Sequence, residues 1–540
     1  MQNPFNVLSV LVIDDAPPIL STIKQMLLKF GVLENNLVTT KSPKAALVHG
    51  SIRSFDLIIC DYNLGTTLNG KQLFEEFIHY GYLRCDAVFM LISGDRSSST
   101  IRPIIELKPD EYILKPFTSQ LLKERSLAAL KRKKALAQLY KAERELDPKF
   151  GLELCGELLP FHREYYFEIE QFRGSFQSML AMHHEAKATY ESLAKQTKSD
   201  WAQLGVANSL ANLGDVEQAN QIVDHLLDKS PNNTCVRTEA AKVSLINHKI
   251  PTAIAHLEVA SQLTPGNSER ELVIVNLCIA VGEYQQALEH FNAYMEINKN
   301  TYRANVFTQI NFVRVMLYSY CESFTNAQLL ADIKRHIHQL VKNRQEQNRD
   351  EIELLLAHYA YASGNFRFAI TCLKKLVAES SINHFYAAYQ LAWILDRLEM
   401  EELFTQAIED CNTSLKIEYS QLLFTSKITM LNKLCHSNKV KNKRLISQHQ
   451  RLKTDNIELS EQLAICLEIL EQNPLLKHVC IRAVKLLNVA WPMHLGGLQV
   501  RRILQKYDHT IRQLFASQDL LNMDYDQHYA SALKRCDERT

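Results

Sequence analysis

Three carboxylates, a hydroxyl and an ammonium group are the side chains of this sequence best placed to do chemistry together: Asp14, Asp15, Asp61, Ser93 and Lys115. Each of them follows a short apolar segment. Carboxylates held close together repel one another and take up protons unless a cation joins them. A set of oxygen ligands with room for water suits a hard ion such as Mg²⁺. These groups therefore predict transfer of a phosphoryl group to a carboxylate, with Mg²⁺ and Lys115 balancing the charge.

The elements that must position these residues are five apolar segments, which we interpret as strands. They are Val7–Ile13, Leu37–Thr40, Leu57–Cys60, Ala87–Ile92 and Tyr112–Leu114. Most are almost continuously hydrophobic, as buried parallel strands are, and helical patterns such as Ile19–Phe30 and Lys71–Tyr80 lie between them. This alternation predicts a doubly wound α/β domain with a five-stranded parallel sheet over residues 5–125. The carboxyl ends of its strands would bring the five polar side chains into one pocket.

The order of these strand ends, Asp-Asp, Asp, Ser and Lys-Pro, resembles the receiver domain of bacterial two-component response regulators. The resemblance implies that Asp61 accepts a phosphoryl group from a sensor histidine kinase or a phosphotransfer protein. It implies that Asp15 binds Mg²⁺ directly, that Asp14 binds it through water, and that Asp61 and the backbone carbonyl of Asn63 complete the protein ligands. One departure lies in the loop after Asp61, which is one residue longer up to Gly70 than in the commonest receivers.

The resemblance also assigns roles around the phosphoryl group. Lys115 would pair with one phosphoryl oxygen and Ser93 would donate its hydroxyl to another. Tyr112, three residues before Lys115, matches the aromatic residue that turns inward when that hydroxyl moves, and Pro116 matches the cis-peptide position. Other interpretations stay open for single residues: each aspartate, or Ser93, could cap a helix, and Tyr112 could be ordinary strand core.

Helical periodicity continues from Thr118 to the C-terminus. Residues 126–164 are predicted to be linking helices, because Ser119–Leu146 contains no glycine or proline and could form one long helix. The basic run 131–134 within it is predicted to be a solvated helix face. Residues 416–540 are predicted to be helical, of a type that the pattern does not specify.

An internal repeat occupies the region between these helical parts. Ala219, Ala253 and Ala287 are 34 residues apart (253 − 219 and 287 − 253), and Pro231 and Pro265 share that spacing. This pattern resembles the tetratricopeptide repeat, a helix-turn-helix unit in which small residues allow paired helices to approach closely. We therefore predict an all-α helical-repeat solenoid, TPR-like, over residues 165–415. The concave groove of such a solenoid usually binds peptides or proteins.

Composition sets outer limits on function. The formal net charge is +1, so no global charge steers the chain to nucleic acid or a membrane surface. The apolar segments are too short to cross a bilayer, which predicts a cytoplasmic protein with no membrane partner. The 12 cysteines contain no Cys-x-x-Cys pair, so we interpret them as small buried hydrophobes in a reducing compartment.

Three kinds of output are compatible with the sequence. The first is binding of an unidentified protein by the repeat arm, with a possible homodimer; no motif of an output enzyme follows residue 125, so the chain is predicted not to be an enzyme beyond its own phosphotransfer. The second is nucleic-acid binding through the basic segment 439–453, although that charge run is more typical of a solvated helix. The third is a phosphatase or modulator activity toward another phosphorelay protein.

Overall fold

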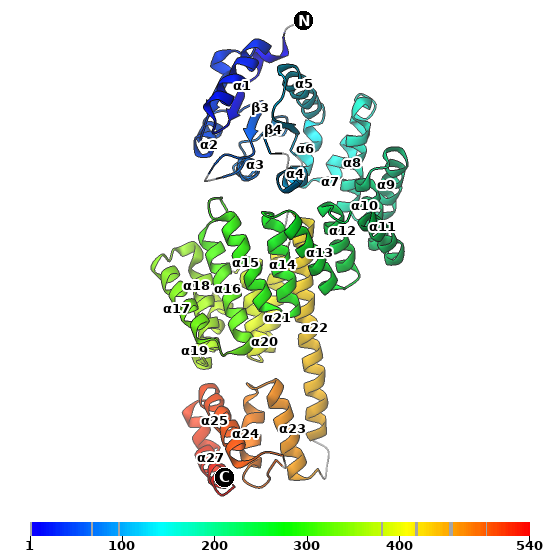
Figure 1. Ribbon diagram of the computed structural model, residues 1–540. Helices are drawn as coiled ribbons and strands as arrows, with labels where there is room; N and C mark the ends of the chain where they lie inside the picture. Colours follow the sequence, from blue (N-terminus) through cyan, green and yellow to red (C-terminus); the bar gives the residue numbers. More distant parts are fainter. Residues whose placement is uncertain are drawn as a thin grey trace. The chain divides into compact units, whose positions relative to one another are not determined.

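The computed structural model describes residues 3–65, 68–95, 98–107, 109–379, 382–415, 420–452, 457–492 and 494–539. The chain divides into two compact units; Figure 1 labels its helices and strands. The first unit comprises Met1–Ile274 with Asn292–Asn305, and the second comprises Val275–Phe291 with Val306–Thr540. Among the described residues, no helix combines the length and the apolar character that a bilayer crossing requires.

The first unit begins with the predicted sheet. Its strands are β1 (Val10–Ile13), β2 (Leu37–Thr40), β3 (Leu57–Asp61), β4 (Val88–Ser93) and β5 (Glu111–Leu114). All pairings are parallel and the order is β2-β1-β3-β4-β5. The order places β1 and β3 next to one another at the centre, so the aspartates at their carboxyl ends become neighbours.

Two hydrophobic cores cover the faces of this sheet. The flanking helices are α1 (Pro17–Phe30), α2 (Pro43–Ile52), α3 (Gly70–His79), α4 (Ser98–Leu107) and α5 (Ser119–Ala135). Along β1, Val10 and Val12 pack with α1 and α5, whereas Leu11 and Ile13 pack with α2, α3 and α4. Both faces are apolar, which explains why the strands lack the alternation of a half-exposed sheet. The doubly wound fold is thereby confirmed.

The first strand starts later than predicted. Pro4–Val7 form a 3₁₀ helix (η1), because the side chain of Asn3 accepts a hydrogen bond from the Phe5 N–H at 3.1 Å and Pro4 starts the turn. Phe5 is buried in the core, whereas the side chain of Val7 is 72% exposed. The apolar letter at Val7 therefore belongs to the turn and not to β1.

The single helix predicted for Ser119–Leu146 is interrupted at Leu136. The helix α5 ends at Ala135 and α6 (Ala137–Arg144) follows, with Leu136 at φ −104° and ψ 12° between them. Leu136 is fully buried in a core that it shares with Leu139 and Phe176. We infer that burial of Leu136 outweighs the lost helical turn, a packing effect to which a scan for glycine and proline is blind.

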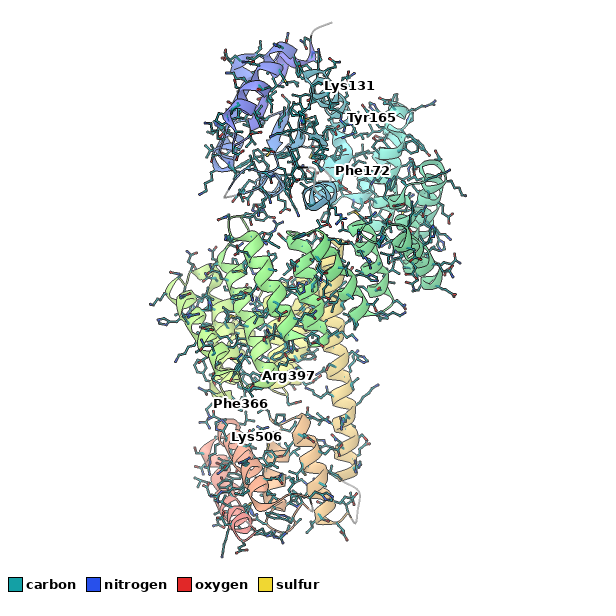
Figure 2. The ribbon with its side chains drawn as sticks, viewed as in Figure 1. Lys131, Tyr165, Phe172, Phe366, Arg397 and Lys506 are labelled. Atoms are coloured by element: carbon teal, nitrogen blue, oxygen red, sulfur yellow. The ribbon has the colours of Figure 1, made fainter. Side chains whose placement is uncertain are left out.

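The basic run 131–134 is only partly the solvated face that was predicted. Lys131, labelled in Figure 2, and Lys134 are exposed. Lys133 is buried, lies 2.9 Å from a carboxylate oxygen of Asp110, and sits over the ring of Tyr140 at 3.7 Å. The prediction fails at Lys133 because a carboxylate and an aromatic face from other elements replace its water.

Antiparallel helix pairs follow in both units, which confirms a TPR-like arm. The helices that lie wholly in the first unit are α6, α7 (Pro148–Leu158), α8 (Tyr166–Met179), α9 (His183–Thr197), α10 (Asp200–Asn212), α11 (Val216–Lys229), α12 (Thr234–Ile246) and α13 (Ile250–Leu263). Two helices, α14 (Ser268–Val281) and α15 (Tyr284–Asn298), are divided between the units. The repeat alanines Ala219, Ala253 and Ala287 are completely buried.

The second unit continues with further pairs and a C-terminal helical part. Its helices are α16 (Val306–Ser323), α17 (Ala327–Lys342), α18 (Arg349–Ala362), α19 (Phe366–Glu379), α20 (Phe385–Arg397), α21 (Glu401–Ser414), α22 (Gln421–Leu452), α23 (Leu459–Gln472), α24 (Lys477–Leu486), α25 (Gly497–Leu514), α26 (Ser517–Asn522) and α27 (Tyr525–Asp537). The last five share a hydrophobic core with Leu452 at the end of α22.

The turn inside each pair has one recurring conformation. A residue with positive φ follows the first helix, at Leu146, Ala181, Gly214, His248, Gly282, Phe324, Gly364 and Glu399. At Gly214 the next N–H, of Asp215, donates to the Leu210 carbonyl at 3.0 Å, and at His248 that of Lys249 donates to the Ser244 carbonyl at 2.8 Å. These bonds satisfy carbonyls that the end of a helix leaves open. The same turn conformation therefore recurs even where the residue with positive φ is not glycine.

Candidate functional site

The strand ends assemble the predicted acidic cluster. One carboxylate oxygen from each of Asp14, Asp15 and Asp61 lies within 4.8 Å of the others. Asp14 is 2% and Asp61 9% exposed, whereas Asp15 is exposed. The Asp14 carboxylate also accepts the Ala16 N–H at 2.9 Å, which fixes its orientation at the start of α1.

Lys115 joins this cluster from the end of β5. Its ammonium nitrogen lies 2.7 Å from Asp14 Oδ2 and 3.1 Å from Asp61 Oδ2. Burial alone would lower the pKa of Lys115, but the two carboxylates outweigh it and raise that pKa. The Lys115–Pro116 peptide bond is cis, as predicted. The ammonium group is therefore a fixed positive charge between the two buried carboxylates.

The charge in the pocket is not balanced by Lys115 alone. Burial raises the pKa of Asp61 and Asp14 adds repulsion, while Lys115 and the Asn63 N–H, which donates to Asp61, act in the other direction. The raised pKa indicates that the negative charge of Asp61 lacks full compensation. Three clustered carboxylates facing one ammonium group form an oxygen-only donor set, which fits Mg²⁺. The residues present thus match the predicted metal.

Ser93 ends β4 and Tyr112 lies within β5, but neither side chain has a described hydrogen bond to Asp61. The hydroxyl of Ser93 is buried, accepts the Asp95 N–H at 3.1 Å and lies 3.4 Å from the Asp95 carbonyl oxygen. The hydroxyl of Tyr112 is buried with no hydrogen-bond partner in the described part of the chain. Burial and the charge of Asp95 raise the pKa of Tyr112. Their switching roles, and the metal contact of the Asn63 carbonyl, stay predictions.

Gly70 is a site residue that the sequence analysis did not assign. Its N–H donates to the Tyr62 carbonyl at 2.7 Å. A Cβ atom at Gly70 would stand 2.6 Å from the Asp61 carbonyl oxygen and 2.9 Å from Tyr62 Cα, so no other residue fits without displacing that backbone. The only signal in the sequence is a glycine directly before the helical pattern that starts at Lys71. Through Gly70, α3 begins in contact with the backbone of Asp61.

The basic segment 439–453 lies mainly on α22, and several of its cations are engaged within the second unit. Lys441 lies 2.7 Å from an oxygen of Asp396 and 3.3 Å from one of Glu399. Arg444 and Arg451 approach Glu468 at 3.2 and 3.9 Å. Lys439 and Lys443 are exposed, and Lys453 lies outside the described residues. The predicted solvated helix therefore describes this segment better than a phosphate-binding surface does.

Known proteins resemble the N-terminal domain and the arm. A family profile described as the response regulator receiver domain matches residues 10–126. The alkaline phosphatase synthesis transcriptional regulatory protein PhoP of Bacillus subtilis is 26% identical over 235 residues, which are 42% of this chain and 89% of PhoP.

Two solved structures show low overall similarity. The N-terminal domain of a response regulator/sensory box/GGDEF three-domain protein from Carboxydothermus hydrogenoformans is 22% identical, with a TM-score of 0.21, covering 23% of this chain and 96% of that one. A tetratricopeptide repeat protein from Parabacteroides merdae is 12% identical, with a TM-score of 0.29, covering 51% and 98%.

Proposed function

We propose, from the premise that residues 10–126 are a response regulator receiver domain, that this chain is a phosphorelay regulator whose Asp61 accepts a phosphoryl group from a histidine kinase or phosphotransfer protein. The observation that carries the proposal is the pocket around Asp61. Its carboxylate lies within 4.8 Å of two further carboxylates and 3.1 Å from the Lys115 ammonium group. This arrangement can hold Mg²⁺ and a transferred phosphoryl group at once.

The residues of the pocket divide the work of the transfer. A carboxylate oxygen of Asp61 forms the new bond to phosphorus, and the donor's leaving group departs with the electrons of the broken bond. Lys115 is placed to neutralise charge on the transferring group. The Ser93 hydroxyl can donate to the same group once it has left Asp95. Asp14, Asp15, Asp61 and the Asn63 carbonyl would hold Mg²⁺, which would supply the remaining positive charge.

The output that we favour is binding of another protein by the helical arm, in the bacterial cytoplasm and with no catalysis beyond self-phosphotransfer. The repeated helix pairs support it, because stacked helix pairs offer extended binding surfaces. The pairing of Lys441, Arg444 and Arg451 within α22 and its neighbours argues against nucleic-acid binding. A phosphatase activity toward another phosphorelay protein and a homodimer are further outcomes for the assays.

The test combines labelling and capture. The purified chain is incubated with acetyl phosphate and Mg²⁺, beside Asp61→Asn and a chelator control, and the phosphate bound to the chain is measured before and after treatment with hydroxylamine. We expect hydroxylamine-labile label on the natural chain only, because hydroxylamine cleaves acyl phosphates. Beads carrying each form, with and without beryllofluoride, then capture partners from a bacterial lysate. Equal labelling of Asp61→Asn would overturn the proposal, and identical capture in both states would overturn its output.

A further inference from the structure

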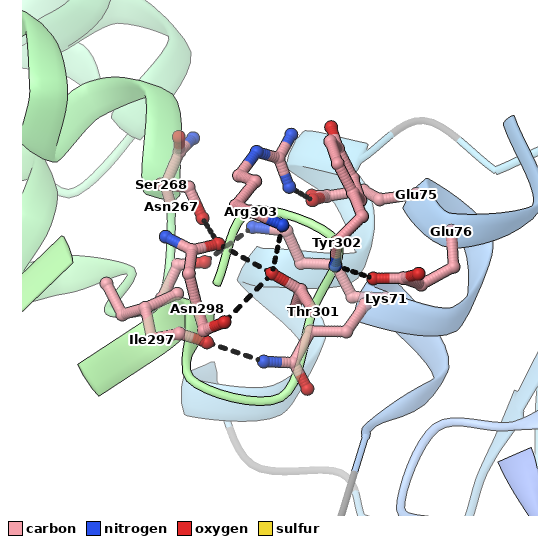
Figure 3. A network of polar contacts seen from close by, with 12 residues as sticks. Lys71, Glu75, Glu76, Asn267, Ser268, Ile297, Asn298, Thr301, Tyr302 and Arg303 are labelled. Carbon is pink, nitrogen blue, oxygen red and sulfur yellow. Dashed lines mark hydrogen bonds and ion pairs between the residues drawn. The ribbon is translucent and has the colours of Figure 1, made fainter. Parts of the chain in front are cut away.

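The receiver domain makes a second, non-local contact with the arm, which we call the receiver–arm clasp. It joins Lys71, Gln72, Glu75, Glu76 and His79 of α3, and Glu106 of α4, to segments 264–270 and 297–303 of the arm. Each segment is a loop with a few residues of the neighbouring helix, and we call them the arm loops. Figure 3 shows the part of the contact around Lys71, Glu75, Glu76, Tyr302 and Arg303. All of these residues belong to the first compact unit. The contact joins segments that lie far apart in the chain.

Three hydrogen bonds to the arm backbone anchor α3. Lys71 Nζ donates to the Gly266 carbonyl at 2.9 Å, and Gln72 Nε2 donates to the Ile297 carbonyl at 2.9 Å. In the other direction, Glu76 Oε1 accepts the Tyr302 N–H at 2.7 Å. The imidazole of His79 stacks on the Tyr302 ring, with centroids 3.6 Å apart and planes 9° apart. The geometry therefore specifies one register of α3 on the arm.

The charges in the clasp are buried or partly buried, and its arginines face carboxylates. Arg303 pairs with Glu75 at 2.5 Å, and Arg270, only 3% exposed, pairs with Glu106. Lys71 is 7% and Glu76 4% exposed. Buried ion pairs gain little net stability, because their attraction is spent on the desolvation of both partners. The clasp is thus specific but close to energetic balance, as polar contacts between domains that separate usually are.

A backbone contact connects the clasp to the phosphoacceptor. Gly70 starts α3 against the Asp61 carbonyl, and Lys71 and Gln72 follow it directly. Gln72 also closes the cap of α3: it donates its N–H to Asn69 Oδ1 at 2.8 Å and accepts the Asn69 N–H at 2.9 Å. A shift of the backbone at Asp61 therefore moves the first turn of α3, which carries two of the anchors to the arm.

A second path runs through Ser93. Its hydroxyl is engaged by Asp95 in the arrangement in which the clasp is closed. To donate to a phosphoryl group on Asp61, that hydroxyl must leave Asp95. Asp95 lies in the chain between β4 and α4, the helix that carries Glu106. The closed clasp thus belongs to the arrangement in which Ser93 does not serve the phosphoryl group.

We infer that the arm loops 264–270 and 297–303 form a docking site for an acidic helix, that α3 occupies it within the chain, and that phosphorylation of Asp61 releases it. This inference rests on the proposed function. The partner chemistry follows from what α3 and α4 supply: carboxylates for Arg270 and Arg303, a carboxylate for the Tyr302 N–H, and an aromatic ring for Tyr302. A partner helix with the same groups would take the place of α3.

Hydrogen exchange of the full chain tests the release. Peptides covering 297–303 are followed with Mg²⁺, with and without beryllofluoride. We expect beryllofluoride to speed their exchange at least about fivefold, the lower range of typical coupling between sites. Asp61→Asn should show no response. Arg303→Glu should exchange fast without beryllofluoride, and the swap Glu75→Arg with Arg303→Glu should restore slow exchange. Lys249→Glu, an exposed site with the same charge change, is the matched control.

A stapled helical peptide of residues 69–80 tests the docking site. We expect it to bind the beryllofluoride-loaded chain at least about fivefold more tightly than the unloaded chain, because the open fraction sets the apparent affinity. Unchanged exchange and equal peptide affinity, with beryllofluoride still bound through Asp61, would overturn the inference and leave the proposed function standing. Failure of Asp61 to bind beryllofluoride or accept phosphate would remove both.

Discussion

At the scale of single residues, the pocket around Asp61 is governed by charge. Asp14 and Asp61 are buried beside one ammonium group, and the raised pKa of Asp61 shows that burial outweighs the help it receives. A bound divalent cation would remove that imbalance of charge. Binding to the folded state alone stabilises it, by about 2.7 kcal/mol when the ligand is at a hundred times its Kd. The metal should therefore be visible as stability.

We predict that Mg²⁺ raises the thermal midpoint of the receiver domain and that Asp15→Asn removes most of the gain. The exposed Asp15 is the predicted direct ligand, so its amide leaves the core intact while weakening the site. Differential scanning calorimetry with Mg²⁺ and with a chelator measures the effect, and Asp519→Asn, exposed and remote in sequence, is the control. A full Mg²⁺ gain in Asp15→Asn would contradict the assignment.

His358 gives a pH prediction for the second unit. Burial, with Arg314 and Arg397 nearby, lowers the pKa of His358 from 6.5 to about 3. Between about pH 6.5 and 3, the imidazole is therefore protonated in the unfolded chain and neutral in the folded chain. The stabilising contribution is complete above about pH 6.5 and falls with decreasing pH, by about 1.4 kcal/mol per pH unit.

The measurement is urea unfolding at several pH values between 4 and 7. The slope of the unfolding free energy against pH should be smaller in His358→Gln by about 1.4 kcal/mol per pH unit. This is the slope that one proton contributes, and Gln cannot be protonated. Gln390 Nε2 donates to His358 Nδ1 at 2.8 Å, so a glutamine side chain at position 358 keeps a polar partner. His436→Gln, at an exposed position, serves as control. Equal slopes in the natural chain and His358→Gln would refute the prediction.

Much of the pocket was predictable because strand ends carry its residues. The order of Asp14, Asp61, Ser93 and Lys115 along the chain becomes proximity through the parallel topology alone. The role of Gly70 could not be predicted. Glycine is required there because a Cβ atom would collide with the backbone of Asp61, and that contact exists only in the folded chain. The bond of Ser93 to Asp95 was equally invisible, because a hydroxyl has many possible partners in a sequence.

At the scale of elements, the arm shows that a repeated backbone conformation can persist where the consensus residues of the repeat are no longer present. Positions 214, 248 and 282 are 34 residues apart (248 − 214 and 282 − 248), and all have positive φ although the middle one is His248. Phe324 plays the same part between α16 and α17, in a stretch where the consensus letters are weak. Sequence periodicity therefore underestimates the number of helix pairs.

His248→Gly should stabilise the chain. A residue with a Cβ in the left-handed region costs about 1–2 kcal/mol, and part of the relief is offset by the freer unfolded glycine. The side chain of His248 is exposed, so little packing is lost. We expect a net gain of about 0.5–1 kcal/mol by chemical unfolding, and the reciprocal change Gly214→His should destabilise. A loss of stability in His248→Gly would contradict this account of the turn.

The junction between α5 and α6 supplies a matched pair of lysines. Lys133→Ala removes the partner of the half-buried Asp110 and should cost about 3 kcal/mol, the usual range for an uncompensated buried charge. Lys131→Ala, two residues earlier and exposed, should change stability by less than about 0.5 kcal/mol. Chemical unfolding monitors both. Equal effects would show that Lys133 behaves as a solvated residue after all.

The element boundaries show where sequence patterns lose information. The five strands and the helices between them follow from apolar segments that local pattern defines. The break at Leu136 and the turn at Pro4–Val7 do not, because each is decided by burial against distant side chains or by a single cap. A scan for glycine and proline cannot find the break at Leu136, because neither residue occurs there.

At the scale of the whole molecule, the parts are joined by contacts that no local pattern encodes. Lys71 and Gly266, or Gln72 and Ile297, meet in the receiver–arm clasp although nothing in their sequence neighbourhoods pairs them. Domain types could be predicted from the sequence, whereas the surface of the receiver that meets the arm could not. That surface is α3, which begins at the phosphoacceptor loop, and it links the chemistry to the proposed output.

The most direct test of the central claim is to locate the phosphoryl group. The full chain is treated with a phosphodonor and Mg²⁺, the acyl phosphate is trapped by borohydride reduction, and the altered residue is identified by peptide mass spectrometry. The account predicts reduction at Asp61 alone, dependent on Mg²⁺ and lost in Asp61→Asn. Modification at another carboxylate, or none in the presence of donor and metal, would contradict it.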